Sequence, residues 1–255
     1  MKASKILLGI FGVIFLMLAL LTVRQVIEIV AAAKGVFYDQ LPYNRRVPGA
    51  ELKILFLGDS TAVGTGASDN RHSTAGYFGQ DFPLADITNN SQNGKKIQEL
   101  LTEISTQTFG KFDLVVIQIG GNDIMKLTPF KNIESDLAAV IERAKTFGRY
   151  VVILHSGNVG TAPIFHWPFD AIMTNRSRKV REIYMSQAKA QGVMYVDLFA
   201  ERKDDLFLKD VKRYYSADSL HPSGDGYRWW YEHIRRTLDQ SGVFLKQKKD
   251  FEYGI

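Results

Sequence analysis

The sequence contains no cysteine among its 255 residues. This absence excludes disulfides, thiolate zinc sites and a cysteine nucleophile, although it leaves the cellular compartment open. The five histidines do not show the spacing of metal ligands, so we expect no metal site. Nucleotide motifs are missing too: there is no Walker sequence, and Gly64-Thr65-Gly66 lacks the third glycine of a dinucleotide fingerprint. These absences predict a protein that works without a cofactor.

Charge is missing from one long stretch near the N-terminus. Residues 6–23 carry no charged side chain and show no polar face. As a helix, these 18 residues span about 27 Å, close to the thickness of a membrane's hydrocarbon core. Arg24 follows the stretch where a cleavage site would need small residues, which favours an uncleaved anchor over a secretory signal.

The flanking charges bear on the orientation of this segment. Lys2 and Lys5 precede it and favour a cytoplasmic N-terminus, with the following domain periplasmic or otherwise extracytoplasmic. Arg24 and Lys34 lie on the other side and weaken that orientation. We attribute the net charge of +5 to ordinary solvent-exposed side chains, and we expect no nucleic-acid partner.

The remaining chain divides by composition. Residues 1–24 form the predicted membrane anchor or signal segment, and residues 25–50, which include Pro42 and Pro48, form a predicted linker. Residues 51–242 are predicted to form one domain, followed by a basic C-terminal tail over residues 243–255.

Buried strands alternate with amphipathic helices in the predicted domain. Apolar runs predict strands over residues 52–57, 84–89, 112–119, 150–154 and 193–196. Helical spacing of apolar residues predicts helices over residues 94–106, 133–147, 173–191 and 222–240. This alternation predicts an α/β fold, a three-layer α/β/α sandwich with a five-stranded parallel, flavodoxin-like sheet.

Polar residues gather in four loops of this pattern. Three loops follow predicted strands and one precedes the last helix, so we expect all four at one edge of the sheet. They contain Gly58-Asp59-Ser60, Asn89 with Gly94, Gly120-Gly121-Asn122-Asp123, and Asp218-Ser219-Leu220-His221. Taken singly, each has a structural alternative, such as a helix cap or an Asx turn.

Taken together, these loops carry the groups that serine-based ester hydrolysis needs. Such chemistry requires a nucleophile, a base, a group that orients the base, and donors for the oxyanion. Asp218 and His221 are three residues apart, so the carboxylate can fix the imidazole tautomer. Asn122 offers an amide donor, and Gly94, at a predicted helix start, offers an unpaired N–H.

These residues resemble the motifs of the SGNH (GDSL-like) hydrolase superfamily, over roughly residues 52–238. The motifs occur in order: GDS at 58–60, an asparagine five residues before a glycine at 89 and 94, GxND at 120–123, and DxxHP at 218–222. The resemblance implies Ser60 as the nucleophile, His221 as the base and Asp218 as its orienter. It also implies an oxyanion hole formed by the N–H groups of Ser60 and Gly94 and by the Asn122 amide.

The resemblance leaves the substrate open. Members hydrolyse esters and thioesters, and some act on acetylated carbohydrates or transfer acyl groups. A small-molecule, lipid or glycan ester is therefore expected, with an O-acetylesterase, an acyltransferase or a non-catalytic binding module as alternatives. We expect substrate contacts from Trp167 and Arg176 in residues 157–178, and from His155 at the end of a predicted strand. The favoured alternative for His155 is a hydrogen-bonded loop anchor. Trp229 and Trp230 lie in the last predicted helix, and we expect its packing against the core, together with its surface, to account for them.

Overall fold

The computed structural model describes residues 2–34 and 40–243 of the chain. Most of the predicted tail, 243–255, and part of the predicted linker lie outside the described residues. The strands are β1 (Lys53–Gly58), β2 (Asp86–Asn89), β3 (Phe112–Gln118), β4 (Gly148–Leu154) and β5 (Met194–Tyr195). The longer helices are α1 (Lys2–Lys34), α3 (Thr74–Asp81), α4 (Ile97–Thr106), α6 (Phe130–Lys145), α7 (Phe169–Gln191) and α10 (Gly224–Gln240). The short elements are α2 (Ser60–Val63), η1 (Asn70–His72), α5 (Gly121–Met125), η2 (Val159–Thr161), α8 (Leu206–Lys209) and α9 (Val211–Tyr214).

The five strands form one parallel sheet in the order β2-β1-β3-β4-β5. This is the doubly wound order of flavodoxin-like folds, so the predicted fold class is confirmed. Alternate residues of β1 enter opposite cores: Leu55 and Leu57 on one face, Ile54 and Phe56 on the other. Burial on both faces explains why the strands read as continuous apolar runs.

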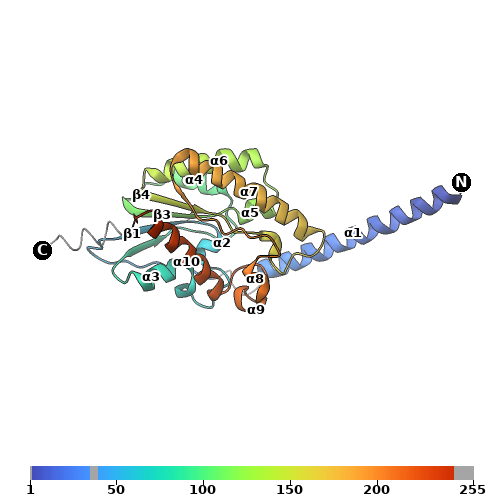
Figure 1. The fold of residues 1–255 in the computed structure, drawn as a ribbon, viewed down its shortest axis with the longest axis horizontal. Helices are drawn as coiled ribbons and strands as arrows, with labels where there is room; N and C mark the ends of the chain where they lie inside the picture. The colour runs from blue at the N-terminus through green and yellow to red at the C-terminus, as the bar shows by residue number, and fades with distance from the viewer. Residues whose placement is uncertain (1, 35–39, 244–255) are drawn as a thin grey trace.

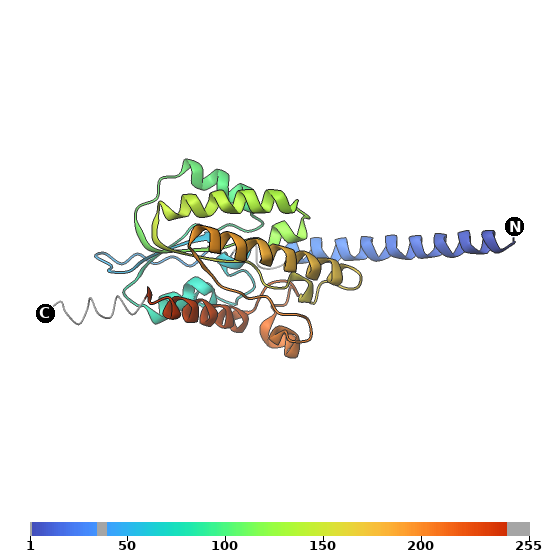
Figure 2. The same ribbon diagram turned by 45° about the horizontal axis from the view of Figure 1, so that its top comes forward.

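Helices cover both faces of the sheet and make three layers (Figures 1 and 2). Apolar residues of α4, α6 and α7 pack on one face, whereas those of α3 and α10 pack on the other. The carboxyl ends of the strands lead into α2 and α5 at the same edge (Figure 1). The predicted loops are therefore brought to one edge of the sheet.

Several predicted elements differ from the structure in their boundaries, and two short helices were not predicted. The last strand, β5, has two residues where four were expected. The long helix α7 begins at Phe169, earlier than residue 173, because Pro168 occupies its N-cap position and needs no backbone N–H there. The charged segment after β5 contains α8 and α9, whose first turns are capped by the carboxylates of Asp205 and Asp210.

The second half of the predicted linker packs on the domain. Arg45 forms an antiparallel bridge with Ile87 of the edge strand β2. Its guanidinium also donates to the carbonyl oxygens of Ala85 at 3.0 Å and Gly79 at 2.6 Å. These bonds fix the segment that enters β1 along the sheet edge.

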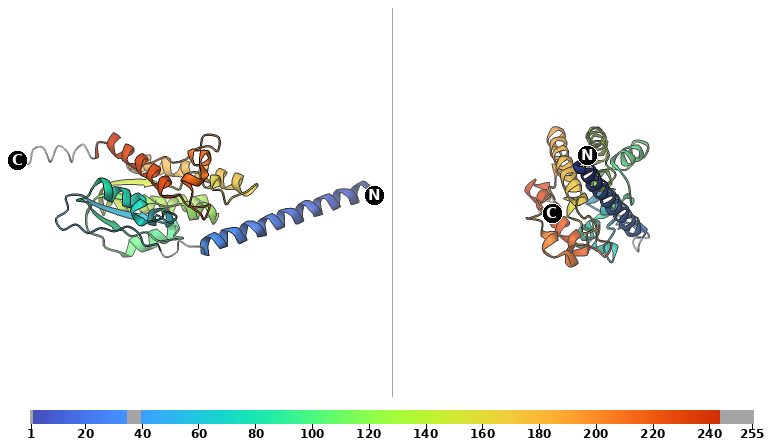
Figure 3. Two further views of the ribbon diagram at one scale, coloured as in Figure 1. Left: turned by 90° about the horizontal axis from the view of Figure 1, so that it is seen from below. Right: turned by 90° about the vertical axis from the view of Figure 1, so that its right-hand side faces the viewer.

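Helix α1 projects away from the domain (Figures 1 and 3). Its residues Ile6–Gln25 are long and apolar enough to cross a membrane, by length and composition. The helix continues to Lys34 and so includes the first part of the predicted linker. It leaves the domain at the end where α5, α8 and α9 lie (Figure 1).

Candidate active site

Ser60 stands at the junction of β1 and α2. Asp59 caps α2: its Oδ1 accepts the N–H of Thr61 at 2.9 Å and the hydroxyl of Thr61 at 2.7 Å. At Gly58 a Cβ would lie 2.0 Å from the carbonyl oxygen of Gln118 on the neighbouring strand β3. A side chain cannot fit there, so glycine is what lets the two strands run close together and leave Ser60 at the sheet edge.

Asp218 organises the turn that carries His221. Its Oδ1 accepts the N–H groups of Leu220 at 2.8 Å and His221 at 2.9 Å, together with the Ser216 hydroxyl at 2.6 Å. Its Oδ2 lies 2.6 Å from His221 Nδ1. Burial acts to raise the pKa of Asp218, but the hydrogen bond and charge of His221, with the other donors, lower that pKa to about 2.

His221 connects this turn to Ser60. An ionised Asp218 accepts hydrogen bonds only, so the proton on His221 is assigned to Nδ1. Nε2 then presents a lone pair and lies 2.8 Å from Ser60 Oγ. The structure thus brings Ser60 of the first motif together with Asp218 and His221 of the last motif, and the three side chains form one hydrogen-bonded chain.

Asn122 lies in α5 beside the loop that holds Gly94. The Nδ2 of Asn122 donates one hydrogen to the carbonyl oxygen of Lys95 at 3.2 Å, which leaves its second N–H for another acceptor. Gly94 has a φ of +77°, a left-handed conformation that favours glycine, and no atom lies within 4 Å of where its Cβ would be. Lys126 Nζ donates to the Gly94 carbonyl at 3.0 Å and ties the same two loops together.

Two further carboxylates brace these loops. Asp123 Oδ2 accepts the N–H of Ile97 at 3.0 Å and so fixes the start of α4. Burial raises the pKa of Asp123 and of Asp59, while their hydrogen bonds partly offset that effect. Among the residues that the structure describes, no group of three histidine or carboxylate residues could hold a metal ion.

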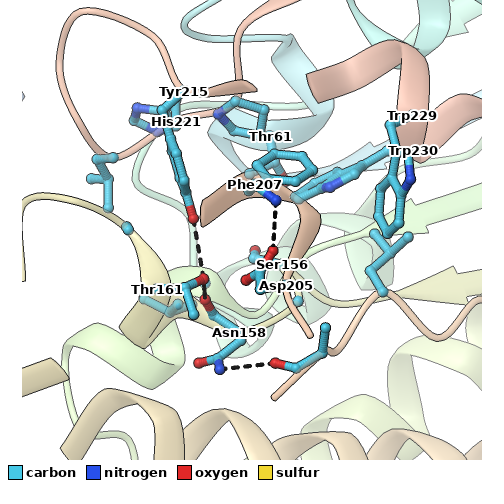
Figure 4. A pocket seen from close by; sticks show the side chains of 18 of the residues that line it. Thr61, Ser156, Asn158, Thr161, Asp205, Phe207, Tyr215, His221, Trp229 and Trp230 are labelled. Atoms are coloured by element: carbon cyan, nitrogen blue, oxygen red, sulfur yellow. Dashed lines mark hydrogen bonds between the residues drawn. The ribbon is translucent and has the colours of Figure 1, made fainter. Parts of the chain in front are cut away.

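A largely apolar cavity adjoins Ser60 and His221 (Figure 4). The hydroxyls of Thr161 and Tyr215 lie 3.2 Å apart in its wall, and Asn158 Nδ2 donates to the Ala200 carbonyl at 3.0 Å. Asp204 and Asp205 also line the cavity. Its apolar lining comes from Met125, Val159, Ala162, Leu198, Leu206, Phe207, Tyr215, Leu220, Trp229 and Trp230.

The aromatic part of this lining was missed in the sequence. Trp229 and Trp230 pack partly in the core, as expected, but both also face the cavity. Phe207 stacks edge-on against Trp229, with ring centroids 5.6 Å apart. For Tyr215 and Trp229, the available signal was closeness to His221 along the chain, since Tyr215 precedes it by six residues and Trp229 follows it by eight.

The three residues expected to touch substrate lie outside the cavity lining. His155 is fully buried, its ring lies between Tyr184 and Tyr195, and burial lowers its pKa to about 4. Neither ring nitrogen makes a hydrogen bond of normal geometry, although a weaker contact with the Gly157 backbone acts to raise the pKa, so the ring packs in the core away from the cavity.

Arg176 and Trp167 also have other surroundings. The Arg176 guanidinium donates to the carbonyl oxygens of Ile124 at 3.0 Å and Thr128 at 2.6 Å, and so joins α7 to the end of α5. Trp167 is 69% exposed and lies beside α1, where it lines a groove with Leu21. Neither position is in contact with the cavity next to Ser60.

Known proteins share this fold. A lipolytic G-D-S-L protein of Veillonella parvula superposes with a TM-score of 0.58 and 20% identity, over 74% of this chain and 98% of the other. An acetylxylan esterase of Geobacillus stearothermophilus gives a TM-score of 0.52 and 21% identity, over 74% of this chain and 95% of the other. At such identities the likeness shows the fold.

Sequence comparison identifies the family. A GDSL-like esterase of Mycobacterium tuberculosis is 25% identical over an alignment of 199 residues that covers 72% of this chain. The chain spans 60% of the length of that curated relative. Residues 56–229 match the model of the GDSL-like lipase/acylhydrolase family. That match covers the strand ahead of Ser60, the Asn122 loop and the Asp218–His221 turn, and the chain belongs to the GDSL-like lipase/acylhydrolase family.

Proposed function

We propose that this chain is a membrane-anchored serine hydrolase that cleaves carboxylic esters or thioesters through an acyl-enzyme. The observation that carries the proposal is the hydrogen-bonded chain from Ser60 through His221 to Asp218, with 2.8 Å between Oγ and Nε2. A serine hydroxyl is a weak nucleophile unless a base receives its proton, and this geometry supplies that base.

The chemistry follows from the protonation states. Ser60 Oγ attacks the carbonyl carbon of the ester while His221 Nε2 takes the hydroxyl proton. The imidazolium, held by the charge of Asp218, returns this proton to the leaving alcohol as the ester bond breaks. Water then attacks the acyl-enzyme, gives its proton to His221 and releases the acid, with Ser60 reprotonated from Nε2.

The negative charge on the carbonyl oxygen needs donors in the transition state. The second N–H of Asn122 is available, because the first is held by the Lys95 carbonyl. The N–H groups of Ser60 and Gly94 complete the proposed oxyanion hole. Such donors act without reorganisation when they are fixed beforehand, and the bonds of Asp123 and Lys126 fix these loops.

The cavity beside Ser60 supports the proposed substrate, and helix α1 supports the proposed location. The cavity next to it is lined mainly by apolar and aromatic side chains, which suit an acyl group. Helix α1 supplies the proposed anchor, and the lysines before it favour an extracytoplasmic domain.

A second candidate is the deacetylation of an envelope polysaccharide, or acyl transfer, by the same residues. Trp229 and Trp230 in the cavity wall favour it, since indole rings stack on sugar faces, and one relative of this fold is an acetylxylan esterase. Product analysis with acetylated sugars against lysophospholipids separates the two: a glycan deacetylase releases acetate, whereas a lipid esterase releases a long-chain acid.

The central test is covalent labelling of the full chain with a fluorophosphonate, combined with turnover of acetyl, long-chain acyl and thioester substrates. The wild type is expected to label and to hydrolyse at least one class, and Ser60→Ala is expected to do neither. Ser91→Ala is the matched control, because Ser91 is also a buried serine after a strand but is not part of the cavity lining. Full turnover by Ser60→Ala would falsify the proposal.

A further inference from the structure

Large apolar side chains are exposed around one end of the domain. Leu127 is 55% exposed, Phe130 37%, Trp167 69% and Ile172 43%. We call these four residues the apolar rim. Single exposed apolar residues are common on soluble proteins, but a group on one face marks an interaction surface.

Contacts show that the rim is continuous. The Arg176 guanidinium lies 4.6 Å from the centre of the Phe130 ring and also donates to the Thr128 carbonyl, next to Leu127. Ile172 is one helical turn before Arg176 on α7, and Trp167 lies two residues before the start of that helix. The rim thus joins the α5–α6 turn to the start of α7.

The position of α1 places this rim at the end of the candidate span. Gln25, the last residue of that span, is 4% exposed; its side chain donates to the Ile164 carbonyl at 2.5 Å and accepts the His166 N–H at 3.1 Å. Leu21 and Arg24 share a groove with Trp167. Trp167 therefore lies at the level where the apolar part of α1 ends.

Two residues that lie near the rim along the chain line the cavity beside Ser60. Met125, two residues before Leu127, and Ala162, five residues before Trp167, both line that cavity. Leu127 itself has a φ of +54°, a conformation that costs a leucine energy and that is kept here while its side chain stays exposed.

We propose that the apolar rim rests on the lipid bilayer that α1 enters, so that the cavity takes amphipathic acyl esters directly from the membrane. The inference rests on the proposed function for its anchor and its ester hydrolysis. The bilayer is the occupant that fits, because the Gln25 bonds hold the rim beside the end of the span. Tryptophan at that level is also typical of membrane–water interfaces.

The absence of cysteine gives a direct test, since one introduced thiol can be labelled uniquely. Leu127→Cys and Ile172→Cys are labelled with an environment-sensitive dye in the full chain, reconstituted in phosphatidylcholine vesicles. Leu84→Cys is the matched control, because Leu84 is 71% exposed but lies just before β2, at the amino ends of the strands and away from the rim. Quenching by nitroxide-labelled lipid is expected to be at least threefold stronger at 127 and 172 than at 84, with iodide quenching in the reverse order.

Equal iodide quenching at all three positions would overturn the inference. So would protection from iodide without lipid quenching, which would indicate a protein partner, or a chain that fails to float with the vesicles. If lipid quenches the dye at the rim but the protein cleaves no ester, the contact of the rim with the bilayer is supported and the proposed hydrolase function is rejected.

A second measurement concerns the substrate. The double variant Leu127→Ser/Ile172→Ser is expected to lower the ratio of turnover on a vesicle-embedded long-chain ester to turnover on a water-soluble ester at least threefold. Leu84→Ser is expected to keep the wild-type ratio. An unchanged ratio in the double variant rejects delivery of substrate from the membrane.

Discussion

The backbone N–H of Ile164 donates to the carbonyl oxygen of Ser219 at 3.0 Å. Ser219 lies inside the turn that holds Asp218 and His221, and its φ of +60° shows that the turn is tightly bent. The carbonyl of Ile164 is in turn bonded by Gln25 of α1. Two hydrogen bonds therefore connect the proposed anchor to the proposed base.

This connection predicts that Gln25→Ala lowers turnover, although Gln25 is not part of the cavity lining. Loss of the two bonds frees the Ile164–His166 backbone, and a hydrogen bond of about 1 kcal/mol corresponds to roughly a fivefold effect. We expect kcat on a soluble ester to fall about fivefold with KM little changed, together with slower fluorophosphonate labelling. Thr22→Ala, which alters a bond within α1, should leave both rates unchanged, and an unaltered kcat in Gln25→Ala would refute the connection.

Asp218→Asn should reduce kcat/KM by about 10⁴-fold, because an amide in place of the carboxylate favours the wrong tautomer of His221. Steady-state kinetics on a small ester provide the measurement. Asp225→Asn is the control with the same change of charge, since Asp225 is exposed and paired with Arg213. A loss of tenfold or less in Asp218→Asn would mean that the carboxylate does not orient His221.

Asn122→Ala should reduce kcat about 10²- to 10³-fold, as expected for one oxyanion donor. The donor acts in the transition state, so kcat and kcat/KM should fall together while KM stays near its original value. Asn132→Ala, at an exposed position on α6, controls for the loss of an amide. If KM rises instead while kcat is kept, the amide binds the ground state and is not an oxyanion donor.

Acid should destabilise the fold through His155. Burial lowers its pKa from 6.5 to about 4, so the unfolded chain binds the proton first as the pH falls. The stabilisation from a neutral His155 is complete above pH 6.5 and decreases by up to about 3 kcal/mol as the pH drops toward 4. His155→Leu should remove that part of the acid sensitivity.

The measurement is the difference in Tm between pH 7.5 and pH 4.5 for the full chain in detergent. His155→Leu is expected to show a clearly smaller difference than the wild type. The exposed His72→Gln should behave like the wild type. An identical decrease in all three proteins would show that His155 stays unprotonated in the unfolded chain or protonated in the fold.

The sequence allowed the sheet and the site loops to be predicted because their signals are local. Continuous apolar runs marked β1, β3 and β4, and the turn from Asp218 to His221 needs four residues. The cavity wall could not be predicted in this way. Phe207 lies in a charged segment whose sequence looks irregular, and the spacing of Trp230 is explained by helix packing alone. Only the folded chain shows that both side chains line the cavity beside Ser60.

Arg176 and Gln25 illustrate the same limit. A positively charged residue near a substrate loop predicts an anion contact, yet the guanidinium of Arg176 is occupied by backbone carbonyls more than forty residues away. The bonds of Gln25 join segments separated by 139 and 141 residues, and no local pattern encodes such a pairing.

Two of the three tryptophans of the chain stand in the wall of the cavity beside Ser60. Indole emission responds to the polarity of its surroundings, so any acyl group that displaces water from that wall changes the intrinsic fluorescence of the protein. The molecule therefore carries its own optical signal of occupancy, which needs no attached dye and no product detection. In rapid-mixing experiments that signal would separate the arrival of the acyl chain from its departure.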